Sequence, residues 1–308
     1  PDDAFLASSS DIDLILVLNG PLPATKLGKI IHQDVMLDVT YLAREELQSA
    51  ELVLGQYHLA GSFRSPGIIM DPTGELTSLQ EAVAAGFARR EWVIHRRDHA
   101  RNKVLHGYRA SEDEPLHAQV TSWLFPAGIL CHVLLVAGLR NPTVRRRYLA
   151  VRELLADYGH AHFYDTMLEL LGCATISPER VAQHLAAVTA AFDAAKQAIK
   201  TPFFFASDIS DIARPVAIDG SREMIAQGDH REAIFWLVAT YSRCQQVFAH
   251  DAPDLSARFE PGFRALLHDL GITSALDLQR RNEDVRAALP SVVALSDAII
   301  ATNPEIKG

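Results

Sequence analysis

Two aspartates separated by one residue stand where an apolar run begins. Asp11 and Asp13 open the stretch DIDLILVL, and side chains two residues apart on a β-strand point to the same face. A third acid, Asp38, lies inside a second apolar run, DVMLDVTYL, where strand propensity disfavours aspartate. If the two strands pair, the three carboxylates converge and repel one another unless a cation lies among them. Because Mg²⁺ prefers carboxylate oxygens, the sequence predicts a magnesium site at Asp11, Asp13 and Asp38, of the kind that supports two-metal phosphoryl transfer.

The elements that must position these acids lie in the first 75 residues. Apolar runs at 12–18, 34–42 and 68–70 are separated by the turn segments NGPLP, SFRSPG and DPTG, which predicts short strands. The second run alternates with a period of two and has Asp38 on its more polar face. An aspartate pair at a strand entrance can also be a turn and a cap, so the position of Asp38 is what favours the metal site.

From Thr77 onward the apolar spacing is helical. Thr77 and Gln80 have the spacing of a capping box and are predicted to begin the first helix. Further helices are expected at about 91–108, 114–139, 143–158, 161–171, 178–199, 219–249 with an interruption near Gly228, 256–269, 274–287 and 290–302. The predicted stops are Gly107, Gly159, Gly172 and Gly271, and the predicted starts include Pro142, Pro178 and Pro290. The expected fold class is α+β: a small mixed β-sheet domain over 1–90, followed by a larger all-α helical bundle domain over 91–308.

The run SSSDIDLILVL, followed about 25 residues later by DVMLDVTYL, resembles the nucleotidyltransferase domain of the DNA polymerase β superfamily. It is most similar to the bacterial branch that includes aminoglycoside and lincosamide nucleotidyltransferases, which often carries an additional helical bundle. The resemblance covers roughly residues 5–75. It implies that Asp11, Asp13 and Asp38 bind Mg²⁺ and a nucleoside triphosphate, and that Asp38 lies nearest the attacking hydroxyl.

The implied reaction moves a nucleoside monophosphate from the triphosphate to a hydroxyl of a small molecule or a protein and releases pyrophosphate. Ser10 and Arg64 are the predicted phosphate contacts. The family also places a Gly-Ser pair before the first two acids, a position that falls at or before Pro1, whereas Gly61-Ser62 follows the third acid. Either that segment precedes this sequence or the chain lacks it. The alternative function is therefore a catalytically inactive binding or antitoxin-like protein with the same fold.

Acids in the helical part are candidates for the acceptor pocket. They are Asp208, Asp211, Asp219 and Glu232, and each also has the sequence context of a helix cap or a favourable first-turn acid.

Two further groups of residues have an alternative interpretation each. Arg101 and His106 in RNKVLHGY resemble the ribonuclease motif of HEPN domains, but the same residues suit a solvated helix face. His160, His162 and Asp165 offer mixed metal donors, but spacings of two and three do not align them on one helix face, which favours local capping.

A cluster of three phenylalanines in TPFFFASD, 201–208, predicts a packed loop between domains and would also suit a homodimer interface.

The composition limits the classes of partner. A net charge of -9 and a pI near 5.8 argue against broad binding to nucleic acid or to an anionic membrane. The apolar stretch near 123–139 contains Pro126, Gly128 and His132, and we expect it to be too polar and too short for a membrane span. No signal peptide is visible at the start. Three cysteines without a CxxC pair indicate reduced, buried thiols, so the expected location is the cytoplasm.

Overall fold

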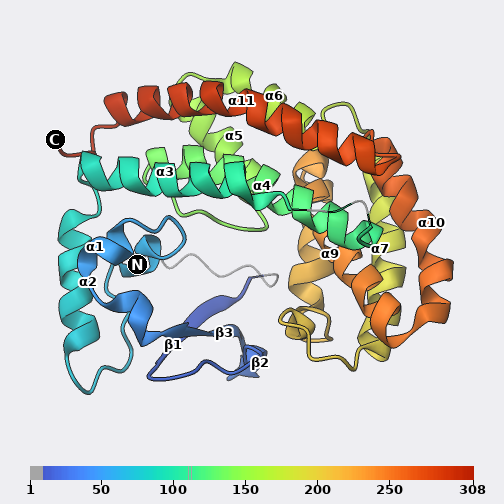
Figure 1. Cartoon of the computed structure of the whole chain (residues 1–308), viewed down its shortest axis with the longest axis horizontal. Coiled ribbons are helices and arrows are strands. Elements are labelled where there is room, and N and C mark those ends of the chain that lie inside the picture. The colour runs from blue at the N-terminus through green and yellow to red at the C-terminus, as the bar shows by residue number, and fades with distance from the viewer. Residues whose placement is uncertain (1–9, 110, 112) are drawn as a thin grey trace. The chain divides into compact units, whose positions relative to one another are not determined.

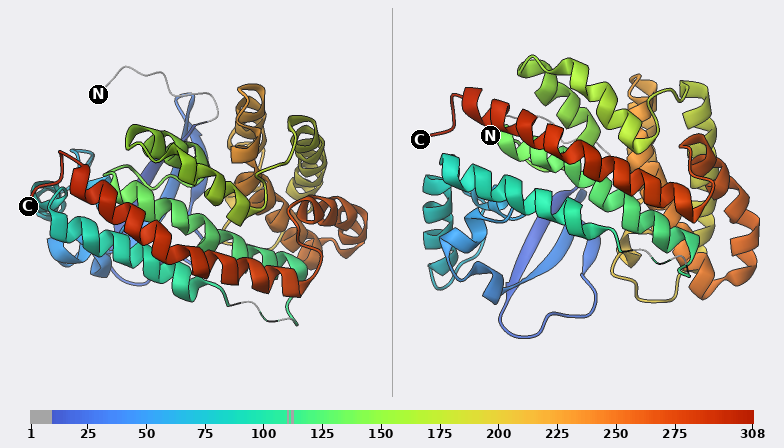
Figure 2. Two further views of the ribbon diagram at one scale, coloured as in Figure 1. Left: turned by 90° about the horizontal axis from the view of Figure 1, so that it is seen from above. Right: turned by 45° about the horizontal axis from the view of Figure 1, so that its top comes forward.

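The computed structural model describes residues 10–109, 111 and 113–308 (Figure 1). Its N-terminal part holds a mixed three-stranded sheet of β1 (Ile12–Leu18), β2 (Gly28–His32) and β3 (Val35–Ala43). The strand order is β1-β3-β2, with β1 parallel and β2 antiparallel to the central β3. Figure 2 shows the three strands side by side. A mixed α/β fold with an N-terminal sheet followed by helices is therefore confirmed.

Two of the predicted strands are confirmed as β1 and β3, but the prediction of a strand at 68–70 is wrong, and β2 was missed. Strand β2 joins β3 through Gln33 and Asp34, which have φ values of 47° and 62°. Positive φ at both central residues is the geometry of a type I′ hairpin turn, for which Asn-Gly is the usual signal. Because the loop is Gln-Asp, the sequence contains no hairpin signal at this point.

Eleven α-helices follow in the described chain. They are α1 (Ala50–Leu54), α2 (Glu75–Gly86), α3 (Arg90–Gly107), α4 (Leu116–Ala137), α5 (Arg147–Asp157), α6 (Tyr164–Leu171), α7 (Pro178–Ala198), α8 (Gly220–Ala226), α9 (His230–Asp251), α10 (Pro253–Asp269) and α11 (Ala275–Thr302). The predicted glycine stops are confirmed: Gly107 is the last residue of α3, and the other three have positive φ just after α5, α6 and α10.

Three predicted helix starts are wrong, and the first is Pro142, because α5 begins at Arg147. Helix α2 begins at Glu75, two residues before Thr77. The Asp71 carboxylate accepts hydrogen bonds from the Thr77 amide and hydroxyl, both at 2.8 Å. Thr77 therefore lies inside the first turn and is not the N-cap. Helix α11 continues through Pro290. By contrast, Pro178 does begin α7, after the N-cap Ser177.

The described residues form two compact units, each of which draws on several stretches of the chain. The first unit contains 10–44, 113–121 and 172–277, and the second contains 45–109, 111, 122–171 and 278–308. The sequence expectation was a division near residue 90. In the first unit, the buried helix α9 packs against α7, α8 and α10. The strands of the sheet contact one another.

In the second unit, α3 and the end of α11 lie side by side (Figure 2). The Arg97 guanidinium, which is buried, bridges them by donating to Ser296 Oγ at 3.0 Å and to Asp297 Oδ1 at 2.7 Å. The helices of this unit are thus held by a polar contact as well as by the apolar core around Trp123, Leu124 and Val104.

Two helices, α4 and α11, are long and apolar enough to cross a membrane by length and composition. In α4, 78% of the most apolar segment is buried, as in the core helix of a soluble protein, and in α11 the share is 33%. The expectation that the stretch near 123–139 is too short was wrong, because α4 has 22 residues and continues through Pro126. Length and composition alone are weak indicators, so the absence of a membrane partner stays a prediction.

Candidate functional site

The register of the sheet brings the predicted acids to one face. Asp13 on β1 pairs with Asp38 on β3, and Asp38 in turn pairs with Lys29 on β2. Directly paired residues on neighbouring strands point to the same side, and Asp11 precedes Asp13 by two residues. Asp11, Asp13, Asp38 and Lys29 therefore share a face, which we call the carboxylate face.

Two lysines offset part of the negative charge of this face. Lys29 Nζ donates to Asp38 Oδ2 at 2.7 Å and also to Asp11, although the Lys29 side chain is only 6% exposed. Lys26 Nζ donates to both oxygens of Asp38, at 3.0 and 3.1 Å. The cation expected among the acids is thus supplied, in this structure, by ammonium groups. The sequence analysis predicts a role for neither lysine. Lys29 lies beside Asp38 only because β2 pairs with β3, and β2 is a strand that the sequence does not predict.

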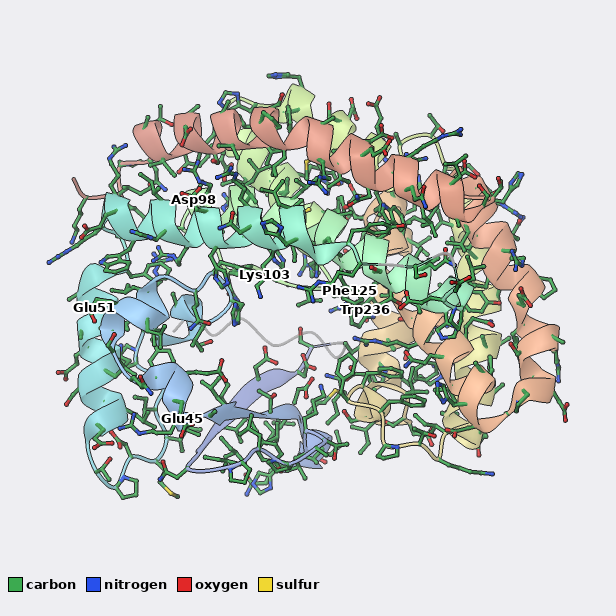
Figure 3. The ribbon with its side chains drawn as sticks, viewed as in Figure 1. Glu45, Glu51, Asp98, Lys103, Phe125 and Trp236 are labelled. Carbon is green, nitrogen blue, oxygen red and sulfur yellow. The ribbon has the colours of Figure 1, made fainter. Side chains whose placement is uncertain are left out.

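A fourth acid reaches the carboxylate face from the helical part of the first unit. Asp208 Oδ1 lies 3.4 Å from Lys26 Nζ, and Asp208 Oδ2 accepts from Arg243 Nη1 at 3.1 Å. The Arg243 guanidinium lies 5.4 Å from the ring centroids of both Phe205 and Trp236. Trp236 projects from α9 (Figure 3). Asp208 is therefore the predicted acceptor-pocket acid that the structure places beside the three aspartates.

The other three predicted acids are engaged elsewhere. Asp211 pairs with Lys196 at 2.5 Å, and Asp219 pairs with Arg214 at 3.2 Å and with Arg222. Glu232 is buried in the first turn of α9. None of the three has an ion pair with Lys26 or Lys29 in the described part of the chain.

Gly28 allows the close approach of Asp208 to the sheet. Gly28 begins β2 with a φ of +76°, and a Cβ built on it would lie 2.1 Å from Ser207 Oγ. A side chain at this position would therefore push away the short helical turn Ala206–Asp208, besides straining the backbone. Gly28 is a positioning residue that the sequence did not flag, because an isolated glycine before a strand has many uses.

The surroundings shift the pKa values of two paired carboxyls in opposite directions. Burial disfavours the charged form of Asp38, but the hydrogen bonds from Lys29 and Lys26 outweigh it, so the pKa of Asp38 is lowered. For Asp13, desolvation and then the charges of Asp11 and Asp38 raise the pKa. Asp13 as a residue is exposed, so its desolvation reflects atoms near the carboxyl and not full burial. Asp38 is thus held as an anion, and Asp13 is the carboxyl that more readily takes a proton.

The carboxylate oxygens of Asp11, Asp13 and Asp38 are suitable ligands for a hard cation, but in this structure those of Asp11 and Asp38 are engaged in ion pairs with lysine. Carboxylate oxygens are the preferred ligands of Mg²⁺. Within residues 10–109, 111 and 113–308, however, no group of three or more His, Cys, Asp or Glu side chains is arranged to hold a metal ion. Two carboxylates, those of Asp11 and Asp38, converge on Lys29 Nζ. A cation bound by the aspartates would take the place of this ammonium group, and the magnesium site stays a prediction.

The remaining predicted residues lie as follows. Ser10 is half-buried and directly precedes Asp11. Arg64 belongs to the second unit, where it donates to the Leu139 carbonyl at 2.8 Å and to Glu305 at 3.2 Å. The prediction of buried thiols is confirmed, because all three cysteines are free and buried.

The alternative motifs are also placed. Arg101 lies on α3, 4.0 Å from Asp98, and the carbonyl of His106 accepts from Arg109. The rings of His160 and His162 lie 6.2 Å apart. Of the three phenylalanines, Phe205 is buried and stacks on Phe203, whereas Phe204 is exposed.

These placements rest on the chain alone. Comparison of the chain with protein-family models, with curated proteins and with solved structures gave no match. The functional interpretation is accordingly built from the carboxylate face itself.

Proposed function

We propose that the chain is a Mg²⁺-dependent nucleotidyltransferase that transfers a nucleoside monophosphate from a nucleoside triphosphate to a hydroxyl of a small molecule or a protein. The observation that carries the proposal is the in-register pairing of Asp13 with Asp38 on a face that also holds Asp11. Three carboxylates on one sheet face are a costly arrangement without a cationic partner, and they fit the resemblance to the DNA polymerase β superfamily.

In the proposed reaction, the acceptor oxygen attacks the α-phosphorus, pyrophosphate leaves, and the hydroxyl proton passes to a nearby base. Asp11, Asp13 and Asp38 would hold Mg²⁺, which on binding neutralises phosphate charge and lowers the pKa of the attacking hydroxyl. Asp38 is the carboxylate proposed nearest the acceptor. Without Mg²⁺ the pKa of Asp13 is raised by desolvation and by its acidic neighbours, and a bound cation would favour its anionic form.

Lys26 and Lys29 have a second use in this proposal. When the aspartates release them, two ammonium groups become available to the negatively charged triphosphate on the same face. Ser10, next to Asp11, and Arg64 stay the predicted phosphate contacts. Only Ser10 belongs to the same unit as the carboxylate face, so Arg64 does not enter the test.

The test is binding of ATP, GTP, CTP and UTP with and without Mg²⁺, measured by thermal shift on the full chain. We expect at least one nucleotide to stabilise the wild type only when Mg²⁺ is present. The double variant Asp11→Asn/Asp13→Asn should lose this stabilisation. The matched control is Asp34→Asn, an exposed acid of the hairpin turn in the same sheet, where Asn tolerates the positive φ. Equal nucleotide binding by the double variant and the control would reject the metal assignment.

The alternative function is a catalytically inactive protein with this fold that binds a partner, as an antitoxin-like protein does. It is compatible with the ion-paired form of the carboxylate face, in which lysines pair with Asp11 and Asp38. The alternative predicts no pyrophosphate release from any triphosphate with a panel of hydroxyl compounds. Mg²⁺-dependent release that is lost in Asp38→Asn would exclude it.

A further inference from the structure

The second unit contains a small cavity whose charged lining is basic. The cavity has a volume of about 50 Å³, and its polar lining comes from Tyr57, Arg64, Arg96, Arg140 and Asn141. All of these residues belong to the second unit. A cavity of this size exceeds the space that one water molecule needs, and three guanidinium groups around it favour an anion.

Arg96 on α3 is the central cation of this lining. It is 2% exposed, and its Nη2 donates to the Phe87 carbonyl at 2.6 Å while its Nη1 donates to the Leu54 carbonyl at 3.2 Å. The Phe87 ring covers the guanidinium at 4.2 Å. These are its contacts in the described part of the chain, so its full positive charge faces carbonyl dipoles and not a carboxylate. Burial, and then the charge of Arg64, lower the pKa of Arg96 to about 10, which reflects this missing counter-charge.

Among the described residues, the acidic partners of the two other arginines lie toward solvent. Arg64 pairs with Glu305, and Arg140 pairs with Asp157, but the side chains of both acids are more than half exposed. Exposed ion pairs of this kind contribute little, because water screens them. Each arginine can therefore release its exposed acid and turn that donor toward an anion in the cavity at small cost, while Arg64 keeps its hydrogen bond to the Leu139 carbonyl.

The end of α4 supports the same cavity with an unusual backbone. Leu139 has a φ of +55°, and the hydrogen bonds from Arg140 N to Leu135 O and from Leu139 N to Val136 O form a Schellman motif. Glycine normally occupies this position, but the chain places Gly138 one residue earlier, where a Cβ would lie 2.3 Å from Leu154. The Leu139 side chain is buried, with 4% exposure, and this burial offsets the backbone strain. In this conformation the Leu139 carbonyl accepts a hydrogen bond from Arg64 at 2.8 Å.

We propose that this cavity binds the oxyanion of a phosphate-type ligand through Arg64, Arg96 and Arg140. An open groove that shares Arg64, Leu139 and Arg140 with the cavity adjoins it. Its lining includes Tyr158, His160 and Asn303, and also Asp157 and Glu305, the acids that pair with Arg140 and Arg64. The groove offers room for the remainder of a phosphomonoester. The proposal concerns the second unit alone and does not depend on nucleotidyl transfer.

A purely structural role for the arginines is the competing explanation. The carbonyls that Arg64 and Arg96 bind belong to the C-terminal ends of α1, α2 and α4, and helix C-termini carry about half a negative charge each. Those partial charges satisfy the donors without any ligand. The two explanations differ in one measurable respect, because only an oxyanion site responds to added phosphate.

The experiment is calorimetric titration of the full chain with inorganic phosphate and, separately, with glycerol 3-phosphate. We expect binding of at least one ligand, weakened about 10-fold or more in Arg64→Gln, because a charge-assisted hydrogen bond is lost. The matched control is Arg101→Gln on α3, since the Arg101 and Arg64 side chains are both 43% exposed. Its affinity should stay within about 2-fold of the wild type. Tighter binding of glycerol 3-phosphate assigns the groove to an esterified phosphate, and tighter binding of inorganic phosphate assigns the cavity to the free ion.

Two results would overturn the proposal. The first is absence of binding, or equal binding by Arg64→Gln and Arg101→Gln. The second is loss of binding in Lys29→Gln with binding retained in Arg64→Gln, which would assign the phosphate to the carboxylate face. Arg96→Lys serves as a second variant that keeps the charge but not the planar fork, and we expect it to fold and to bind phosphate more weakly.

Discussion

The carboxylate face of the first unit and the Arg96 site of the second unit bury charge in different ways. On the carboxylate face of the first unit, acids and lysines of opposite sign share hydrogen bonds. In the second unit, the contacts of the buried Arg96 guanidinium with described residues are two backbone carbonyls and the Phe87 ring. The aspartates can release their lysine partners and bind another cation in their place. The Arg96 guanidinium instead donates to the C-terminal ends of two helices and holds those ends together. The comparison teaches that the first arrangement is suited to exchange of partners and the second to permanent support with residual positive charge.

The largest expected loss of stability comes from replacing Arg96, the arginine that binds two backbone carbonyls. Arg96→Met leaves the carbonyls of Leu54 and Phe87 without their buried donor, so we expect a loss of about 3 kcal/mol in the free energy of unfolding. Urea denaturation followed by circular dichroism measures it. The control is Arg89→Met, whose side chain is 59% exposed and should change stability by less than about 0.5 kcal/mol. Equal stability of the two variants would show that Arg96 supports nothing.

The next effect concerns the approach of Asp208 to the sheet. Gly28→Ala should reduce the free energy of unfolding by about 2 kcal/mol, because it adds a clash with Ser207 to the strain of a positive φ. Gly20→Ala is the matched control, since Gly20 has a φ of +93° and no atom within 4 Å of the added Cβ. We expect about 1 kcal/mol for the control. If both variants lose the same amount in thermal or chemical denaturation, the contact with Ser207 has no energetic role.

A smaller effect is expected from the paired charge, and it should depend on pH. The pKa of Asp38 is lowered in the folded protein, so its ionisation contributes stability above the unfolded pKa of about 3.9, and this contribution is lost as the pH falls through the folded pKa. Asp38→Asn should therefore cost about 1–2 kcal/mol at pH 7 and progressively less below pH 4. Unfolding curves at pH 7, 5 and 3 measure this. A difference from wild type that is constant over this range would contradict the ion-paired geometry.

The smallest effect has the opposite sign. The pKa of Asp13 is raised by desolvation and by the neighbouring acids, so its ionisation at neutral pH lowers stability, and the protein gains stability as Asp13 takes up a proton. Asp13→Asn should therefore stabilise the protein without ligand at pH 7, by less than about 0.5 kcal/mol because the residue is exposed. Differential scanning calorimetry detects the change. A lower melting temperature for Asp13→Asn than for wild type would mean that Asp13 is held by a favourable contact.

Part of this arrangement follows directly from the sequence. The period of two around Asp38 and the apolar run after Asp13 predict β1 and β3, and the shared face of the acids follows from strand geometry. Glycine after an apolar periodic stretch predicts the ends of α5, α6 and α10, because only glycine adopts the left-handed conformation without strain.

Other parts depend on contacts that a local pattern does not contain. Lys29 joins the acids only because β2 pairs with β3 through a Gln-Asp turn. Asp208 joins them through a contact between residues 182 positions apart in the sequence. The left-handed residue after α4 is Leu139 and not the adjacent Gly138, because close packing on Leu154 already requires the glycine. Tertiary packing decides each of these cases, and local propensity is overridden.

The interleaving of the two units along the chain has a consequence for biosynthesis. The strands of the carboxylate face leave the ribosome before the segment 172–277 that completes their unit, and residues 45–171, most of which belong to the second unit, are translated in between. Contacts between residues so far apart in the sequence slow folding. The newly made sheet therefore keeps an unpaired edge strand while most of the other unit is translated. Expression of either unit as one uninterrupted fragment would leave it without segments that it needs, so truncated products are expected to aggregate.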